Sequence, residues 1–153
     1  MRRHSQTYSA AGLAQSRLWP VGTLCITIAA NIAETAILTY PACFPDSVVG
    51  FVSDGERVLT RYVQVSLQAM KQRLWELAPA TAQKNINLAT LDAIAIPLPP
   101  PAEQARIVAE VDRMMSQADF VESTAKATLA RSEVLRTAVL RSAFTPGVGE
   151  NVA

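Results

Sequence analysis

The sequence contains very few of the residues on which side-chain catalysis and metal binding usually depend. It has one histidine, His4, and two cysteines, Cys25 and Cys43, whose separation is not that of a metal site. It also has no P-loop, no glycine-rich dinucleotide pattern and no HExxH motif. We therefore predict a protein that is not an enzyme and that uses no cofactor and no metal.

An excess of charge of one sign is also absent, since the formal net charge is only +1. A nucleic-acid partner would therefore require basic residues concentrated in one place rather than a basic average. Half of the 153 residues are hydrophobic and 18% are charged, which favours a compact core over disorder. We expect the two cysteines to be small buried hydrophobic residues in a reducing compartment, and we predict a cytoplasmic protein.

A secretory signal is the alternative to a cytoplasmic location. The chain opens with MRRH, and residues 21–33 are mostly apolar. The polar residues among positions 5–9, together with Gln15 and Arg17, do not fit such a signal, and the apolar run ends at Glu34. This run is shorter than the roughly 20 residues of a membrane span, so we predict no membrane association. Export would instead predict a mature N-terminus beyond Ala33.

The first part of the chain has the pattern of a small sheet with one helix. Residues 24–28, 36–40 and 47–52 are short apolar runs, and the first is expected to be a strand buried on both faces. Residues 56–77 show apolar spacings of three and four, which predict an amphipathic helix capped by Ser53 or Asp54 and ended by Pro79. Residues 94–98 alternate like a further strand, and the sequence AAGLAQSR favours a short helical turn.

Residues 80–88, ATAQKNINL, form a polar loop that supplies candidate DNA contacts. Asn and Gln side chains can pair with adenine, and Lys can bind guanine or phosphate. An ordinary connecting loop has the same composition, so both interpretations remain open. The predicted DNA-contacting residues are Gln83, Lys84, Asn85 and Asn87, with Arg17 and Thr7 as weaker candidates.

Four prolines between residues 97 and 101 separate this mixed part from a helical one. Each proline fixes φ near about −65° and pushes the residue before it toward extended geometry. Pro101 suits the first turn of a helix, where its missing N–H costs nothing, and Glu103 suits the positive end of the helix dipole. We expect a stiff extended segment, called the proline segment (residues 94–101), that starts a long helix at a fixed angle.

Residues 102–145 contain neither glycine nor proline and predict one helix roughly 65 Å long. Its apolar residues fit a seven-residue repeat, and its charges balance, which fits pairing with another helix better than binding along DNA or a membrane. Small residues at 128 and 132 leave open a break or phase shift near 130–133. The predicted pairing residues, called the seam below, are Ile107, Val111, Met114, Ala118, Val121, Ala125, Leu135 and Val139.

Three segments of the sequence resemble the specificity subunit of type I restriction–modification enzymes. QKNINLATLDAIAIPLPPPAEQARIVAEVD closely resembles the end of a target-recognition domain, where an apolar proline segment precedes a Glu–Gln pair, here Glu103–Gln104. LRTAVLRSAFTPGV is similar to the end of the family's conserved helix. GLAQSRLWPVGTLCITIAANIAETAI is similar, more loosely, to the second half of the recognition domain.

The resemblance implies an α+β fold, with a partial mixed α/β target-recognition domain followed by a long coiled-coil-forming α-helix. The domain would occupy residues 1–100, the spacer helix 101–146 and a tail 147–153. The domain would read half of a split double-stranded DNA target. The helix would pair with a second half-subunit or with a second copy of this chain, and would set the spacing between half-sites. Methyltransferase subunits would dock on this frame, and the restriction subunit would join through them.

Two features depart from the family's pattern. Full specificity subunits carry two recognition domains and two helices, whereas this sequence matches one helix and the later half of one domain. This suggests a truncated product, a piece of a split subunit or a half that dimerises. The pair Ala33–Glu34 stands where the family often has glycine followed by a polar or basic residue. The alternative function is therefore a helical interaction protein, left from a truncated specificity subunit, that does not bind DNA.

Overall fold

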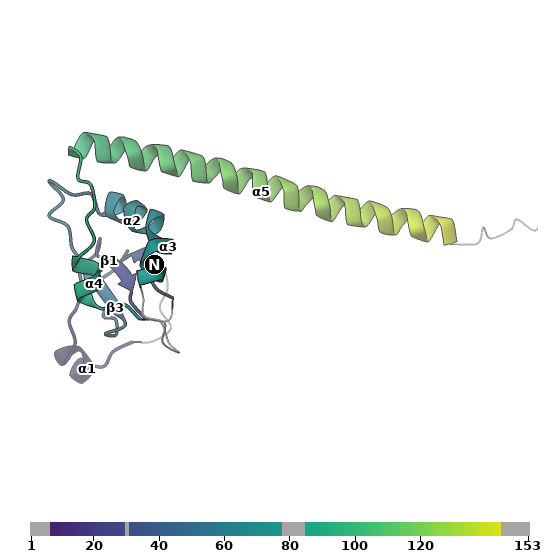
Figure 1. The fold of residues 1–153 in the computed structure, drawn as a ribbon. Helices are drawn as coiled ribbons and strands as arrows, with labels where there is room; N and C mark the ends of the chain where they lie inside the picture. The colour runs from purple at the N-terminus through teal and green to yellow at the C-terminus, as the bar shows by residue number, and fades with distance from the viewer. Residues whose placement is uncertain (1–6, 30, 78–84, 145–153) are drawn as a thin grey trace, which may run out of the picture. The chain divides into compact units, whose positions relative to one another are not determined.

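The computed structural model of the chain describes residues 7–29, 31–77 and 85–144 (Figure 1). Its elements follow the order α1, β1, β2, β3, α2, α3, α4, α5. The chain divides into two units, Met1–Val111 and Asp112–Ala153, and the long helix α5 (Pro101–Phe144) contributes to both. The first unit holds the sheet and the short helices, and the described part of the second unit consists of the remainder of α5.

Three antiparallel strands form the sheet of the first unit. They are β1 (Leu24–Thr27), β2 (Thr35–Ile37) and β3 (Val48–Phe51), in the order β2-β1-β3. All three lie within the predicted runs except for the start of β2, and β1 is almost wholly buried, as expected for a central strand. The register pairs Leu24 with Ile37 on one side and with Phe51 on the other.

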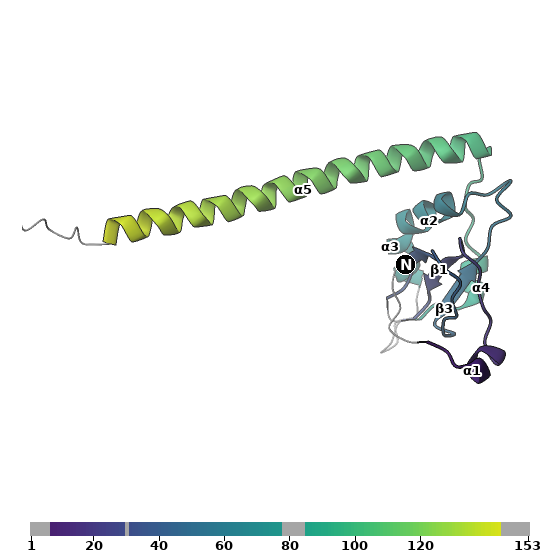
Figure 2. The same cartoon turned by 180° about the vertical axis from the view of Figure 1, so that it is seen from behind.

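One face of the sheet carries the hydrophobic core. Because paired residues of antiparallel strands point to the same face, Leu24, Ile37 and Phe51 form one row across it. This row packs with apolar residues of the helices α2 (Thr60–Ala69) and α3 (Lys71–Leu77), and Figure 2 shows α2 and α3 beside β1 from behind. The buried residues of this cluster are Leu24, Ile26, Ile32, Ala33, Val63, Leu67, Leu74 and Ile86.

One row on the opposite face of the sheet consists of small residues. The register places Ala36, Cys25 and Gly50 in one row. A Cβ atom on Gly50 would lie only 2.6 Å from Cζ3 of Trp19, so glycine is needed there for the indole to pack on the strand. Cys25 is buried as predicted, and burial raises the pKa of its thiol. Cys43 is only half-buried, so the same prediction is wrong for it; both residues are free thiols.

The predicted helix over residues 56–77 is wrong in its start and in its continuity. The structure has α2 from Thr60 and α3 from Lys71, with a tightened turn in which the Met70 N–H bonds to the carbonyls of Ser66 and Leu67. The predicted capping by Ser53 or Asp54 is also wrong, since the N-cap is Leu59, which has no side-chain cap.

Ser53 and Asp54 have a different role, because they organise the turn that precedes α2. Oδ1 of Asp54 accepts hydrogen bonds of 3.2 Å from the N–H groups of Glu56 and Arg57. The Arg57 bond is the main cause that lowers the pKa of the Asp54 carboxyl. The Ser53 hydroxyl donates to the Val58 carbonyl. These side chains therefore form hydrogen bonds with backbone groups of their own turn and not with the first N–H groups of α2.

The predicted strand over residues 94–98 is absent, although this segment is extended. Instead of a sheet partner, it has contacts with single side chains, described below.

Two short helices complete the first unit. The helix α4 (Leu88–Asp92) precedes the proline segment, and α1 (Ala10–Ala14) forms within AAGLAQSR as predicted. Ser9 caps α1 by accepting from the Gly12 N–H at 3.2 Å.

The long helix α5 is confirmed, with Pro101 in its first turn and 44 residues without a break near 130–133. Predicted residues 145 and 146 of the helix and the tail 147–153 lie outside the described residues. None of the helices within the described ranges is both long and apolar enough to cross a membrane.

Candidate functional site

The first turn of α5 is attached to the domain by the amide of Gln104. Its Oε1 accepts a hydrogen bond of 2.9 Å from the Leu59 N–H, and its Nε2 donates to the carbonyls of Arg57 and Pro99, each at 2.8 Å. The side chain is fully buried and uses both donors. One amide therefore connects three segments of chain: α5, the proline segment and the loop before α2.

Tyr62 provides a second contact with the proline segment. Its hydroxyl donates a hydrogen bond of 2.7 Å to the Pro97 carbonyl, and the residue is buried in the first turn of α2. We call the set of Arg57, Leu59, Tyr62, Pro97, Pro99 and Gln104 the joint. The joint explains why residues 94–98 need no strand partner, since carbonyls of the proline segment are satisfied by side chains.

Glu103 lies beside the joint but faces outward. Its carboxylate forms a two-bonded ion pair with Arg106, with distances of 2.7 and 2.8 Å. This pairing lowers the pKa of the Glu103 carboxyl and raises the pKa of the Arg106 guanidinium. Glu103 therefore stabilises the exposed side of the N-terminal end of α5, whereas Gln104 connects the helix to the domain.

The predicted DNA-contacting residues are only partly described. Gln83 and Lys84 lie outside the described residues. Asn85 is exposed and forms an isolated bridge with Ala29 next to the end of β1. Asn87 caps α4, because its Oδ1 accepts from the backbone N–H of Thr90 at 2.9 Å and from the hydroxyl of that residue at 3.0 Å. The side-chain oxygen of Asn87 is therefore occupied by the cap of α4. Its amide N–H groups are the atoms that would donate hydrogen bonds to a DNA base.

The two weaker candidates lie near the N-terminal end. Thr7 is exposed. The guanidinium of Arg17 lies 3.9 Å from the centre of the Trp19 ring, and this ring stacks on Phe44 with centroids 5.1 Å apart. A cation held over an aromatic face is restrained while its N–H edge stays exposed, which is a suitable arrangement for contact with a phosphate.

The turn that differs from the family's pattern has a positive φ at Ala33, which is 61°. Its N–H bonds to the Thr27 carbonyl at 2.9 Å, and the residue is buried. A left-handed conformation costs a residue with a Cβ roughly 1–2 kcal/mol, so this turn does require the geometry that glycine adopts most easily. The next residue, Glu34, pairs with Lys71 of α3.

The seam residues differ in burial along α5. Ile107 and Val111 are half-buried, whereas the other six are exposed, with Val121, Leu135 and Val139 at 66%, 59% and 65%. Every residue from 113 to 144 is exposed. Further large apolar side chains are exposed on this helix outside the seam: Met115, Phe120, Leu129, Val134, Leu140 and Phe144. Phe120 and Leu129 adjoin the seam residues Val121 and Ala125 on one shallow apolar face.

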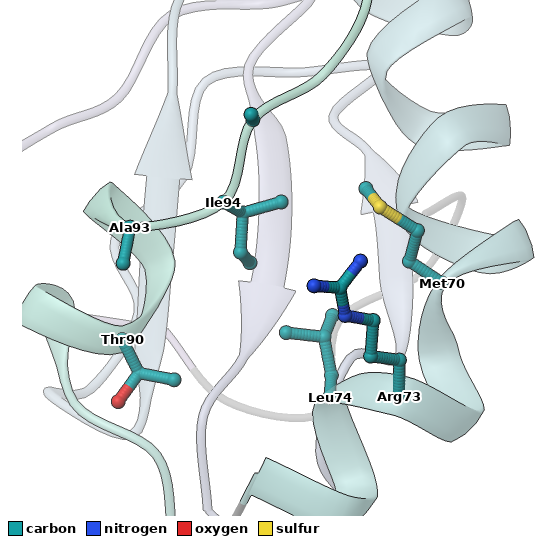
Figure 3. Close-up of a pocket in the computed structure, with 7 residues that line it drawn as sticks. Met70, Arg73, Leu74, Thr90, Ala93 and Ile94 are labelled. Carbon is teal, nitrogen blue, oxygen red and sulfur yellow. The ribbon is translucent and has the colours of Figure 1, made fainter.

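A cavity of about 370 Å³ lies between α2–α3, α4 and the start of the proline segment (Figure 3). Met70, Leu74 and Ile94 give it apolar walls, and Figure 3 shows the Arg73 guanidinium directed into it. In the described parts of the chain, no group of three or more His, Cys, Asp or Glu residues is arranged to hold a metal ion.

Comparison with known proteins places this architecture in a family. Residues 2–131 match the model of the type I restriction modification DNA specificity domain, and the chain therefore belongs to that family. This confirms the resemblance noted from the proline segment and the Glu103–Gln104 pair. The α+β fold class is confirmed as well, since the three-stranded sheet with its helices and the long C-terminal helix match the specificity-subunit fold.

The curated relatives are specificity subunits of type I restriction enzymes. The chain is 26% identical over 104 residues to the StySPI subunit of Salmonella potsdam, covering 66% of this chain and 22% of that protein. It is 31% identical over 83 residues to the EcoBI subunit of Escherichia coli, covering 54% and 18%. The chain thus spans about a fifth of the length of these two relatives.

Two solved structures share the fold. One comes from work on complex assembly and conformational transition of the type I R-M system, with a TM-score of 0.73, 22% identity, and coverage of 86% of this chain and 33% of that one. The other is the S subunit from M. genitalium, with a TM-score of 0.55, 14% identity, and coverage of 70% and 29%.

Proposed function

We propose that this chain is the part of a type I specificity subunit that reads one half of a split double-stranded DNA target. The observation that carries this proposal is the family match over residues 2–131. The curated relatives are named as specificity subunits, which supports a recognition role without catalysis of its own. Arg17 over Trp19, the exposed Asn85, and the loop residues Gln83 and Lys84 are the proposed DNA contacts, with Asn87 and Thr7 as secondary ones.

We further propose that α5 pairs with another helix. The support is its row of exposed apolar side chains, which water would otherwise surround over most of the helix length. Its partner is the equivalent helix of a second half-subunit or of a second copy of this chain. Methyltransferase subunits dock on the resulting frame, and the restriction subunit binds through them.

The functional boundary between recognition domain and spacer helix stays at residues 100 and 101 in this proposal. Residues 101–111 of α5 nevertheless belong with the first unit, because the joint attaches the first turn of the helix to the domain. The joint is therefore the connection through which the spacer helix is oriented.

DNA binding measured as a function of salt tests the proposal. The chain, mixed with the methyltransferase subunits of its own system, should retain duplex DNA and lose affinity steeply as salt rises, because phosphate contacts release counterions. Negligible binding that does not change with salt would contradict it. The second candidate, a helical interaction protein without DNA binding, is favoured by the strained Ala33 turn and would show helix-dependent association only.

A further inference from the structure

The only buried side chain among the described residues of α5 belongs to a polar residue, Gln104. Apolar contacts restrain a helix through packing, but hydrogen bonds also have a preferred direction, which the hydrophobic effect lacks. Hydrogen bonds to Leu59, Arg57 and Pro99 fix the amide plane in two directions. The attachment of α5 therefore depends on orientation as well as burial.

We propose that Gln104 is a positioning residue that fixes the direction in which α5 leaves the domain, and that it thereby restricts the assembly to one spacing between the two DNA half-sites. This inference rests on the proposed function for its consequence on DNA. The part that concerns the joint stands on the contacts of Gln104 alone.

The length of the helix makes its starting angle important. A straight helix of 44 residues extends about 66 Å, so a tilt of about 3° at its first turn displaces its far end by about 3.4 Å. That displacement equals the rise of one base pair. A small loss of order at the joint is therefore enough to accept a half-site spacing changed by one base pair.

Three substitutions separate the contacts of the joint. Gln104→Met keeps the size of the side chain and removes all three hydrogen bonds. Gln104→Glu keeps an acceptor for the Leu59 N–H but removes the donors to the Arg57 and Pro99 carbonyls. Tyr62→Phe removes only the hydrogen bond to the Pro97 carbonyl, and this variant tests the joint if the Gln104 variants do not fold. Glu103→Gln is the matched control, since Glu103 contacts Arg106 and not the joint.

The first measurement is a distance between two spin labels within the first unit. The labels replace Ala69 in α2 and Ala109 in α5, both exposed alanines, and are introduced without cysteine chemistry so that Cys25 and Cys43 remain. We expect a narrow distribution for the unsubstituted chain and for Glu103→Gln. Gln104→Met and Gln104→Glu should broaden it by about 3 Å, which corresponds to a tilt of about 14° over the roughly 12 Å of helix between Pro101 and Ala109. A tilt of that size is more than enough to move the far end of α5 by one base-pair step. Tyr62→Phe should broaden it less.

The second measurement is the map of methylated sites in cells that express the chain with the methyltransferase subunits of its system. The unsubstituted chain and Glu103→Gln should modify sites of one spacing. A folded Gln104 variant should also modify sites whose spacing differs by one base pair, a change that a simple loss of stability would not produce.

The two measurements distinguish failure of the inference from failure of the proposed function. Unchanged distance distributions in both Gln104 variants and in Tyr62→Phe would overturn the inference, whatever the DNA result. Broadened distributions with an unchanged spacing would overturn its consequence for DNA. Absence of methylation with the unsubstituted chain would contradict the proposed function, while the distances would still decide the role of Gln104.

Discussion

Oε1 of Gln104 accepts a hydrogen bond from the N–H of Leu59, a residue 45 positions earlier in the chain. Leu59 is the N-cap of α2, and its own side chain makes no capping bond. The start of α2 and the start of α5 are therefore organised by the same amide group. This relationship explains why a polar residue occupies the one buried position of the described long helix.

Removal of the Gln104 amide should destabilise the chain. In Gln104→Met, the Arg57 and Pro99 carbonyls and the Leu59 N–H lose their partner, and each unsatisfied buried group costs about 1–3 kcal/mol. Since water can reach part of the joint, we expect the free energy of unfolding to fall by about 2–4 kcal/mol, measured in urea. The surface variant Glu103→Gln should change it little, and equal losses in both variants would argue against this account.

The positive φ of Ala33 predicts an unusual response to glycine. Ala33→Gly and Ala36→Gly each remove one methyl group, but only the first relieves a left-handed backbone. We expect Ala36→Gly to lower the free energy of unfolding by about 1 kcal/mol. Ala33→Gly should be about 1–2 kcal/mol more stable than Ala36→Gly. Thermal unfolding of both variants measures the difference, and an equal loss in the two would show that the turn carries no strain.

The contact of Trp19 with Gly50 predicts a steric penalty. Gly50→Ala places a methyl group 2.6 Å from the indole, which must move, and we expect a loss of about 1–3 kcal/mol. The tryptophan emission should shift as Trp19 becomes more exposed and its contact with Arg17 changes. Trp19→Leu in the same chain should remove most of the penalty of Gly50→Ala; a fully additive double variant would contradict the contact.

The exposed apolar side of α5 predicts association through the seam. Leu135→Asp and Val139→Asp should abolish helix pairing, because each puts a charge where an apolar partner surface is expected. Thr137→Asp adds the same charge outside the seam and should leave the association intact. Sedimentation of the chain, alone and with its partner subunits, measures the effect. Assembly of unchanged size in all three variants would rule out the seam as the pairing surface.

Several elements were predictable because one local rule decides them. The strands β1, β2 and β3 follow from apolar β-branched runs between turns, and α5 follows from the long stretch without glycine or proline that comes after Pro101. The resemblance carried by the proline segment and Glu103–Gln104 gave the family, which the family match confirms.

Other features of the structure could not be predicted from the local sequence pattern. The apolar periodicity of residues 56–77 continues through Met70, so it does not reveal that the helix is divided there. Asp54 was expected to cap a helix but accepts from its own turn, and the delayed start of α2 coincides with the bond from Leu59 to Gln104. Residues 94–98 have the alternating pattern of a strand, yet the Pro97 carbonyl accepts a hydrogen bond from the Tyr62 hydroxyl and not from a neighbouring strand. The roles of the DNA-contacting and seam residues stay predictions.

The proposed recognition of DNA by this chain is tested by its affinity for duplex DNA at increasing salt in the presence of the methyltransferase subunits. We expect an association constant whose logarithm falls linearly and steeply with the logarithm of salt concentration, with a smaller slope in Arg17→Ala because one phosphate contact is lost. Arg17 also contacts the ring of Trp19, so the thermal unfolding of Arg17→Ala is measured in parallel to check that the variant is folded. Negligible affinity for DNA at low salt, in a mixture that forms a stable complex with the methyltransferase subunits, would contradict the claim.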